Sequence, residues 1–185
     1  PEAEAIGRVR SVSFSIIKTK ESLPQEFHYL KYLEKLNVAS NENTARLNID
    51  LGSDICDLNY LKDISIFAYG LVSLPNDFSK LGKSLEKLNL GANNFATIPS
   101  ILNKSNFPRL KSLVLTGMRR WDGITDLRSI TEPKYEDGIG LHLNLNTDSS
   151  IKSLFLWDSL EEVRLSYCYL EGHLPEFEVG KDGIQ

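Results

Sequence analysis

The chemistry that this sequence could support begins with its polar and ionisable residues. Asn144, Asn146 and Asp148 alternate as NxNxD, and oxygen ligands at this spacing occur in calcium-binding loops. The glycine and the distal glutamate of an EF-hand are absent, so the sequence predicts no metal site here. The histidines, which could act as bases or ligands, are scattered along the chain as His28, His142 and His173.

A catalytic pair of carboxylates is not expected either. Glu161 and Glu162 are adjacent, but neighbouring residues on a strand face opposite directions and cannot act on one substrate. The motifs GxxxxGK[ST], HExxH, CxxC and GxSxG, which mark phosphate, zinc, redox and nucleophile sites, do not occur. We therefore predict that the chain is not an enzyme and needs no cofactor.

A repeated pattern of leucines must position all of these residues. The segment SLEKLNLGANNFATIPSI places Leu85, Leu88 and Leu90 at the spacing LxxLxL, with Asn93 three residues later. The pattern LxxLxLxxNxLxxIP describes one unit of a structural repeat, and this segment matches it at every position. Alternate residues of a strand point to one face, so we expect Leu88 and Leu90 in the core and Asn89 in solvent.

The same unit recurs at nearly constant intervals. Leu61 and Leu85 are 24 residues apart, and Leu110 follows after 25 more. Leu160 lies 50 residues beyond Leu110, so we place one irregular unit between them, with its strand at Leu141-Leu143-Leu145. One unit cannot bury its own apolar edge, and stacked units are therefore required. The pattern predicts six or seven parallel strands, near residues 11–15, 35–39, 63–67, 87–91, 112–116, 142–146 and 162–166.

The return segments between these strands are less regular. Residues 24–33 carry apolar side chains at helical spacing and predict a short helix. Residues 47–51 alternate between apolar and polar side chains and predict a small extra strand. Residues 121–138 break the periodicity. They form either an Ω-like excursion or a degenerate return segment with Ile124 and Leu127 packed onto the core.

The two cysteines are expected to be free, buried thiols. Strands about 4.8 Å apart put roughly 20 Å between Cys56 and Cys168, whereas a disulfide needs Cα atoms within about 7 Å. Cys168 stands at the turn position that Asn93 occupies in its own unit. At that interior position a carboxamide can bond backbone groups of adjacent coils that the turn leaves unpaired.

Composition agrees with one repeat domain. A chain of 185 residues with 41% hydrophobic side chains can bury one continuous core, so we assign residues 1–185 to a single domain of about seven coils. The net charge of −4 provides no basic surface for nucleic acid. There is no run of 18 apolar residues, so no membrane-spanning segment is predicted. Because the sequence begins at Pro1, we expect a piece of a longer array with its targeting segment elsewhere.

The segments SLEKLNLGANNFATIP and LSYCYLEGHLP resemble leucine-rich-repeat proteins, and the resemblance covers Val9 to Pro175. The irregular spacings and the GRVRSVSF opening resemble exported surface members from Bacteroidota. The resemblance implies an α/β fold, namely a right-handed superhelical solenoid with a parallel concave sheet and short helices and irregular segments on the convex side. It also implies an extracellular or cell-surface location. The family's asparagine ladder is interrupted here by Ile17, Tyr69, Met118 and Cys168.

In such a solenoid the side chains between the leucines form the concave face, which is the usual binding surface. Most of these side chains are small and weakly charged, but Phe67 is an aromatic ring with no structural need to be there. Aromatic and arginine side chains are the usual anchors of interfaces. The predicted binding residues are Phe67, Asn89, Arg164, Tyr167, Arg119, Arg120 and Trp121.

The resulting interpretation is a non-catalytic binding module whose concave face recognises a protein, with a glycan as the alternative ligand, at a bacterial cell surface. A structural spacer in a larger surface protein and the non-catalytic part of an enzyme are the other interpretations. The last coil shows no cap in the sequence, so we also predict self-association through residues 160–178, visible as concentration-dependent dimers in light scattering.

Overall fold

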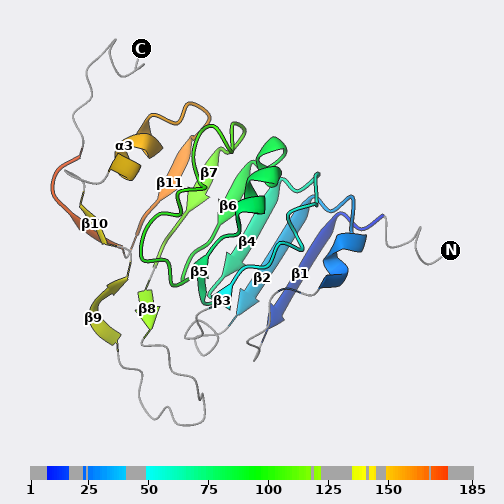
Figure 1. Cartoon of the computed structure of the whole chain (residues 1–185), viewed down its shortest axis with the longest axis horizontal. Coiled ribbons are helices and arrows are strands. Elements are labelled where there is room, and N and C mark those ends of the chain that lie inside the picture. The colour runs from blue at the N-terminus through cyan, green and yellow to red at the C-terminus, as the bar shows by residue number, and fades with distance from the viewer. Residues whose placement is uncertain are drawn as a thin grey trace, which may run out of the picture.

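A six-stranded parallel sheet is the largest element of the chain, for which a computed structural model describes residues 8–16, 23, 25–40, 49–117, 119–121, 135–140, 142–144, 149–166 and 168–174. Its strand order is β1-β2-β4-β6-β7-β11 (Figure 1), and every neighbouring pair is parallel. The predicted parallel sheet is thus confirmed. Its strands are β1 (Ser11–Ile16), β2 (Lys35–Ser40), β4 (Asp63–Phe67), β6 (Lys87–Asn89), β7 (Ser112–Val114) and β11 (Glu162–Arg164).

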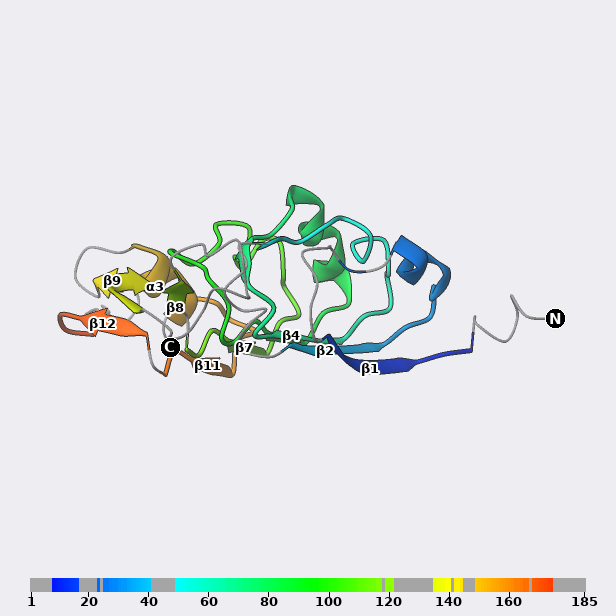
Figure 2. The same ribbon diagram turned by 90° about the horizontal axis from the view of Figure 1, so that it is seen from below.

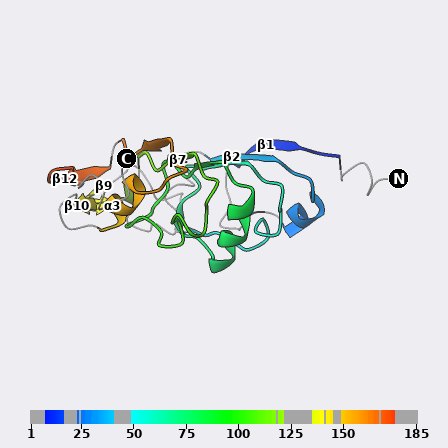
Figure 3. The ribbon, with the colours of Figure 1, turned by 90° about the horizontal axis from the view of Figure 1, so that it is seen from above.

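The return segments cover one side of this sheet. Figure 2 and Figure 3 show the strands along one side of the molecule and the helical turns and loops on the other. The 3₁₀ helix η1 (Gln25–Tyr29) follows β1, as the sequence predicted. A longer 3₁₀ helix, η2 (Asn76–Lys83), precedes β6, and α3 (Ser149–Phe155) precedes β11. This is a leucine-rich-repeat solenoid, while the hand of its superhelix stays a prediction.

Equivalent residues of successive coils lie side by side in the core. Leu36 pairs with Ile64, Ile64 with Leu88, and Leu88 with Leu113. These four side chains are at most 1% exposed. The next inward row is fully buried and consists of Val38, Ile66, Leu90 and Leu115. The alternation predicted from LxxLxL is therefore confirmed.

This register makes opposite predictions for two neighbouring residues. Leu90→Ala should lower the free energy of unfolding by about 2–5 kcal/mol, because it removes a buried side chain and leaves a cavity. Asn89→Ala should cost less than about 1 kcal/mol, because the Asn89 side chain points away from the core and is only half-buried. Urea unfolding of both variants measures the difference. Equal losses would mean that the strand register is shifted by one residue.

The turn after β6 is closed by one buried side chain, Asn93, which is 0% exposed. Its Nδ2 group donates to the carbonyl oxygens of Ile66 at 2.7 Å and Leu90 at 2.8 Å. Its Oδ1 atom accepts hydrogen bonds from the backbone N–H groups of Tyr69 at 3.0 Å and Leu71 at 3.1 Å. The carboxamide thus bonds backbone groups of its own coil and of the preceding one, as predicted.

The prediction that residues 142–146 form a seventh strand of the main sheet is wrong. Strand β10 (His142–Asn144) pairs instead with β12 (Tyr169–Glu171) in a separate two-stranded sheet. Strands β7 and β11 pair directly, with Leu113 opposite Val163, so no coil lies between them. Trp157 Nε1 also donates to the Phe107 carbonyl at 3.2 Å, which joins the last coil to the one that precedes it in space.

Two further strand pairs among the described residues also lie outside the main sheet. Between β7 and α3, strand β8 (Arg119–Trp121) pairs antiparallel with β9 (Tyr135–Gly140), which agrees with an excursion from the solenoid. Ile124 and Leu127 lie outside the described residues. The extra strand predicted at 47–51 is confirmed as β3 (Ile49–Asp50), which pairs parallel with β5 (Leu71–Ser73).

Candidate functional site

The outward side chains of the six strands form the concave face, and the register arranges them in rows. In the described part of the chain these side chains are exposed or half-buried. The first row is Ser11, Lys35, Asp63, Lys87, Ser112 and Glu162. The second row is Ser13, Asn37, Ser65, Asn89, Val114 and Arg164, and the third begins with Ser15, Ala39 and Phe67.

Phe67 lies on this face and is 43% exposed. Its ring is placed against Gly91, because a Cβ atom at Gly91 would lie 3.1 Å from two of the ring carbons and from Asn89 Oδ1. Asn89 Oδ1 in turn accepts a hydrogen bond from the Gly91 N–H at 2.9 Å. Two of the predicted binding residues therefore meet over one glycine, whose role sequence reasoning missed. A glycine in the outward position just after a strand was the signal.

At the β11 end of the concave face, the Glu162 carboxylate accepts hydrogen bonds from two neighbouring side chains. Arg164 Nε donates to Glu162 Oε1 at 2.7 Å, and Ser112 Oγ donates to the other carboxylate oxygen at 2.8 Å. The hydrogen bonds from Ser112 and then from Arg164 hold the pKa of the Glu162 carboxyl below its usual value. The predicted anchor Arg164 is thus engaged within its own strand, two strands away from Asn89.

Another series of outward residues, separate from the three rows of the concave face, runs along the edge where the sheet strands begin. We call this series the leading rim. One charged residue per coil forms it: Arg10, Glu34, Lys62, Glu86, Lys111 and Glu161. The backbone N–H of each later member donates to the carbonyl of the preceding one at 2.8 Å, so the six are neighbours in space. Sequence reasoning missed this row, although its signal is regular, because each member directly follows the first leucine or valine of LxxLxL.

The leading rim is partly cross-linked between coils. Lys62 Nζ contacts Glu34 Oε2 at 2.8 Å, and Arg10 Nε lies 3.7 Å from Glu34 Oε1. The hydrogen bond from Lys62 is the main reason why the pKa of the Glu34 carboxyl is lowered. The Arg10 guanidinium also lies 5.0 Å from the centre of the Tyr32 ring, and the Tyr32 and Tyr60 rings are 5.5 Å apart.

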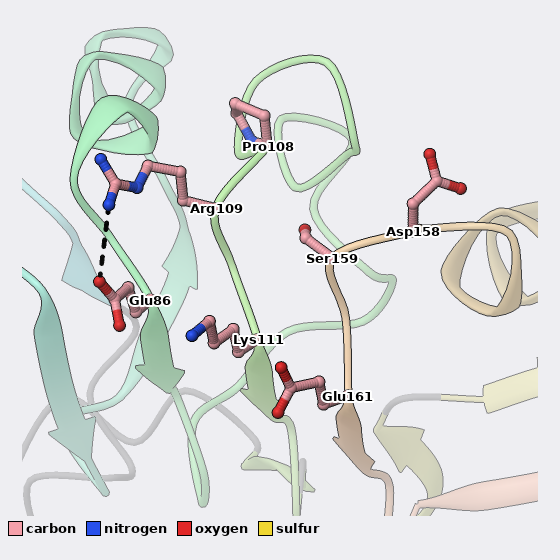
Figure 4. A pocket seen from close by; sticks show the side chains of 7 residues that line it. All are labelled: Glu86, Pro108, Arg109, Lys111, Asp158, Ser159 and Glu161. Atoms are coloured by element: carbon pink, nitrogen blue, oxygen red, sulfur yellow. Dashed lines mark ion pairs between the residues drawn. The ribbon is translucent and has the colours of Figure 1, made fainter.

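A shallow hollow of about 270 Å³ opens on the same rim between β6, β7 and β11 (Figure 4). Its one ion pair among the residues drawn joins Arg109 to Glu86 at 3.9 Å. Glu161 lines this hollow, whereas Glu162 lies on the concave face, so the two adjacent glutamates do not share a site. The lining consists of Glu86, Pro108, Arg109, Lys111, Asp158, Ser159 and Glu161.

For the remaining predicted binding residues, the described part of the chain shows no contact with Phe67. The backbone of Arg119, Arg120 and Trp121 forms β8, which belongs to a separate pair of strands, and their side chains lie outside the description. Tyr167 and Met118 also lie outside the described residues. The binding roles of the three β8 side chains and of Tyr167 therefore stay predictions.

Neither cysteine has the character of a reactive thiol site. Cys56 is fully buried, and burial, followed by the charge of Asp77, raises the pKa of its thiol to about 12. Cys168 Sγ donates to the Leu115 carbonyl at 3.1 Å, the counterpart of the bond from Asn93 to Ile66 in an earlier coil. Neither cysteine forms a disulfide, as predicted, and Cys56 is buried as predicted. Cys168 is only partly buried, because its coil is the last of the sheet.

Metal and membrane sites find no counterpart in the described part of the chain. No group of three or more His, Cys, Asp or Glu side chains is placed there to hold a metal ion. Asn146 and Asp148 of the NxNxD segment lie outside it. None of the helices described is long and apolar enough to cross a membrane.

The end of the sheet at β11 exposes apolar surface. Leu160, Val163 and Leu165 are half-buried, whereas the equivalent Leu110, Leu113 and Leu115 of the preceding coil are fully buried. Leu170 and Leu174 are 45% and 68% exposed. The predicted self-association through this end stays a prediction.

Comparison with known proteins rests on solved structures, since no family model and no curated protein matches the chain. A leucine-rich-repeat protein of Leptospira interrogans shares 25% identity and a TM-score of 0.57 over 90% of this chain. An internalin of Listeria monocytogenes shares 21% identity and a TM-score of 0.46 over 92%. The chain spans 39% and 52% of the lengths of these two proteins. The resemblance to proteins of Bacteroidota stays a prediction.

Proposed function

We propose that this chain, a leucine-rich-repeat protein, is a non-catalytic binding module whose concave face binds another protein. Stacked repeats create an extended surface whose outward side chains can change without disturbing the core. Here the inward rows are buried and carry the stability, and the outward rows are exposed or half-buried, where a partner can reach them.

The observation that supports this proposal most directly is the placement of Phe67. An aromatic ring that is 43% exposed contributes little to the core, and a partner that covers it would gain its remaining apolar area. Contact with Gly91 limits the positions of the ring, so less conformational entropy is lost when a partner binds. Small neighbours, Ala39 and Ser65, leave the ring accessible from the concave side.

A glycan is the second candidate, and a specific feature favours it. The part of the second row beside Phe67 carries amide and hydroxyl groups, those of Asn37, Ser65 and Asn89. Such groups can hydrogen-bond sugar hydroxyls while an aromatic ring stacks against the apolar face of the sugar. A structural spacer would make no use of this face, so binding that depends on Phe67 separates the spacer from both candidates.

The test compares Phe67→Ala with a matched control, Phe155→Ala. Phe155 lies in α3 and is 52% exposed, so both variants remove an exposed phenyl ring. Immobilised wild-type and variant proteins are incubated with a cell-envelope lysate, and retained proteins are quantified. In parallel, the three proteins are applied to a glycan array.

We expect wild type and Phe155→Ala to retain the same protein in equal amounts. Phe67→Ala should retain at least about tenfold less of it, the loss typical of an anchor residue. Thermal melts of both variants establish that the fold is intact. Equal retention by Phe67→Ala would contradict a role of the concave face. Loss of glycan binding alone would assign the face to a glycan.

The proposed location is the bacterial cell surface or the extracellular space. It is supported by the resemblance of the irregular spacings and the GRVRSVSF opening to exported repeat proteins. Protease treatment of intact cells, followed by detection of the chain, tests this location directly.

A further inference from the structure

The six charges of the leading rim alternate in sign from coil to coil. Positive Arg10, Lys62 and Lys111 are separated by negative Glu34, Glu86 and Glu161. Pairing between adjacent coils explains the first part of the series, where Glu34 contacts both of its neighbours. It does not explain the whole, because no ion pair joins Lys62 to Glu86 in the part of the chain that the structure describes.

The later coils carry charges that this part of the chain leaves unpaired. Lys111 and Glu161 make no ion pair or side-chain hydrogen bond among the described residues, and Figure 4 shows the Lys111 ammonium between the Glu86 and Glu161 side chains without a contact to either. Lys87, beside the rim in the first row of the concave face, makes no ion pair there either. These groups are available to a partner.

We propose that the leading rim binds a second copy of this chain. A series of alternating charges is complementary to itself when it is reversed, so it suits an interface in which the same surface is used twice. A two-fold axis lying in the interface and crossing the rim between Lys62 and Glu86 reverses the series. An axis along the rim would bring like charges together, so the charge pattern selects the first arrangement.

With the axis across the rim, each of its six charges faces an opposite charge of the second copy. Lys111 faces Glu34, Glu161 faces Arg10, and Lys62 faces Glu86. The first row of the concave face obeys the same rule, because Lys87 then faces Asp63. The pairing does not depend on the number of coils, since every axis between two adjacent coils gives opposite signs.

The tyrosines beside the rim add apolar contact to these pairs. Tyr32 and Tyr60 are 46% and 53% exposed and are held by the stack with Arg10. In the proposed arrangement Tyr32 faces Arg109 of the second copy, and Tyr60 faces Ser84, a small residue. Tyrosine and arginine are the residue types that most often anchor interfaces.

The rim is narrow, so the dimer should be weak and sensitive to salt. Six strands about 4.8 Å apart span roughly 24 Å. The area that this narrow rim can bury is therefore smaller than the roughly 800 Å² per partner of a standard stable interface. The distance over which two charges interact, the Debye length, shortens from about 10 Å at 0.1 M salt to about 3 Å at 1 M, so salt should weaken the dimer. This dimer uses only the first row of the concave face and leaves the rows of Asn89 and Phe67 open, so it goes beyond the function proposed above and does not depend on it.

The test mixes two variants, Lys62→Glu and Glu86→Lys, and measures mass by sedimentation equilibrium at low salt. Each variant alone sets two like-charged pairs across the interface, so its dimerisation should weaken at least about tenfold relative to wild type. In the mixture the glutamate introduced at position 62 of one variant faces the lysine introduced at position 86 of the other, and the opposite pair is native. Heterodimers should therefore form with nearly wild-type affinity.

A control pair, Lys80→Glu and Asp77→Lys, makes the same charge changes on η2 in the return segments and should leave dimerisation unchanged, alone or mixed. Wild-type protein that stays monomeric at millimolar concentration would overturn the proposal. So would association that persists in Lys62→Glu and is unaffected by mixing, because it would then arise elsewhere, as at the apolar end beyond β11.

Discussion

Asn93→Ala should lower the free energy of unfolding by about 3–5 kcal/mol. The substitution deletes a fully buried carboxamide that bonds three backbone carbonyls and two backbone N–H groups. Each buried group left without a partner costs about 1–3 kcal/mol, and water cannot replace all of them without opening the turn. Urea unfolding followed by circular dichroism measures the loss.

The control for this variant is Asn103→Ala. Asn103 is half-buried and bonds only backbone groups of its own turn, such as the Ser100 carbonyl and the Asn106 N–H. Its loss should cost about 1 kcal/mol or less, because water can reach the groups that it leaves. A loss below about 1 kcal/mol in Asn93→Ala would show that the coils are not joined through this side chain.

Much of the fold could be predicted because it depends on local alternation. Leu88 and Leu90 must share a face if the segment is a strand, and neighbouring units must repeat that arrangement, so six strands follow from the spacing. The strand at residues 142–146 could not be placed in the same way. Alternation predicts a strand, but its partner is decided by which coils stack, and Val163 lies directly beside Leu113.

The candidate site was predictable only in part. The outward position of Phe67 follows from the same alternation, whereas its contact with Gly91 joins residues of two coils and requires the register between them. The charges of the leading rim show the same limit. Lys62 and Glu86 are unremarkable within their own units, and they become a series only when equivalent positions are read across coils.

Gly82→Ala should destabilise the fold by about 3 kcal/mol or more, because the added methyl group has no space. A Cβ atom at Gly82 would lie 1.6 Å from the carbonyl oxygen of Asn106 and 3.1 Å from the Cα atom of Phe107. Both are backbone atoms of the next coil and cannot rotate away. Alanine favours a helix over glycine by about 1 kcal/mol, but overpacking against backbone costs more. Thermal and urea unfolding measure the net effect.

Gly91→Ala is the matched comparison, since it adds the same methyl group on the concave face. The three atoms nearest to its Cβ atom would be side-chain atoms of Phe67 and Asn89, each at 3.1 Å, and these side chains can move by a few tenths of an ångström. We expect a loss below about 1 kcal/mol, together with weaker capture of a partner because the Phe67 ring is displaced. If Gly82→Ala were as stable as Gly91→Ala, η2 could not pack against the Asn106 backbone as closely as described.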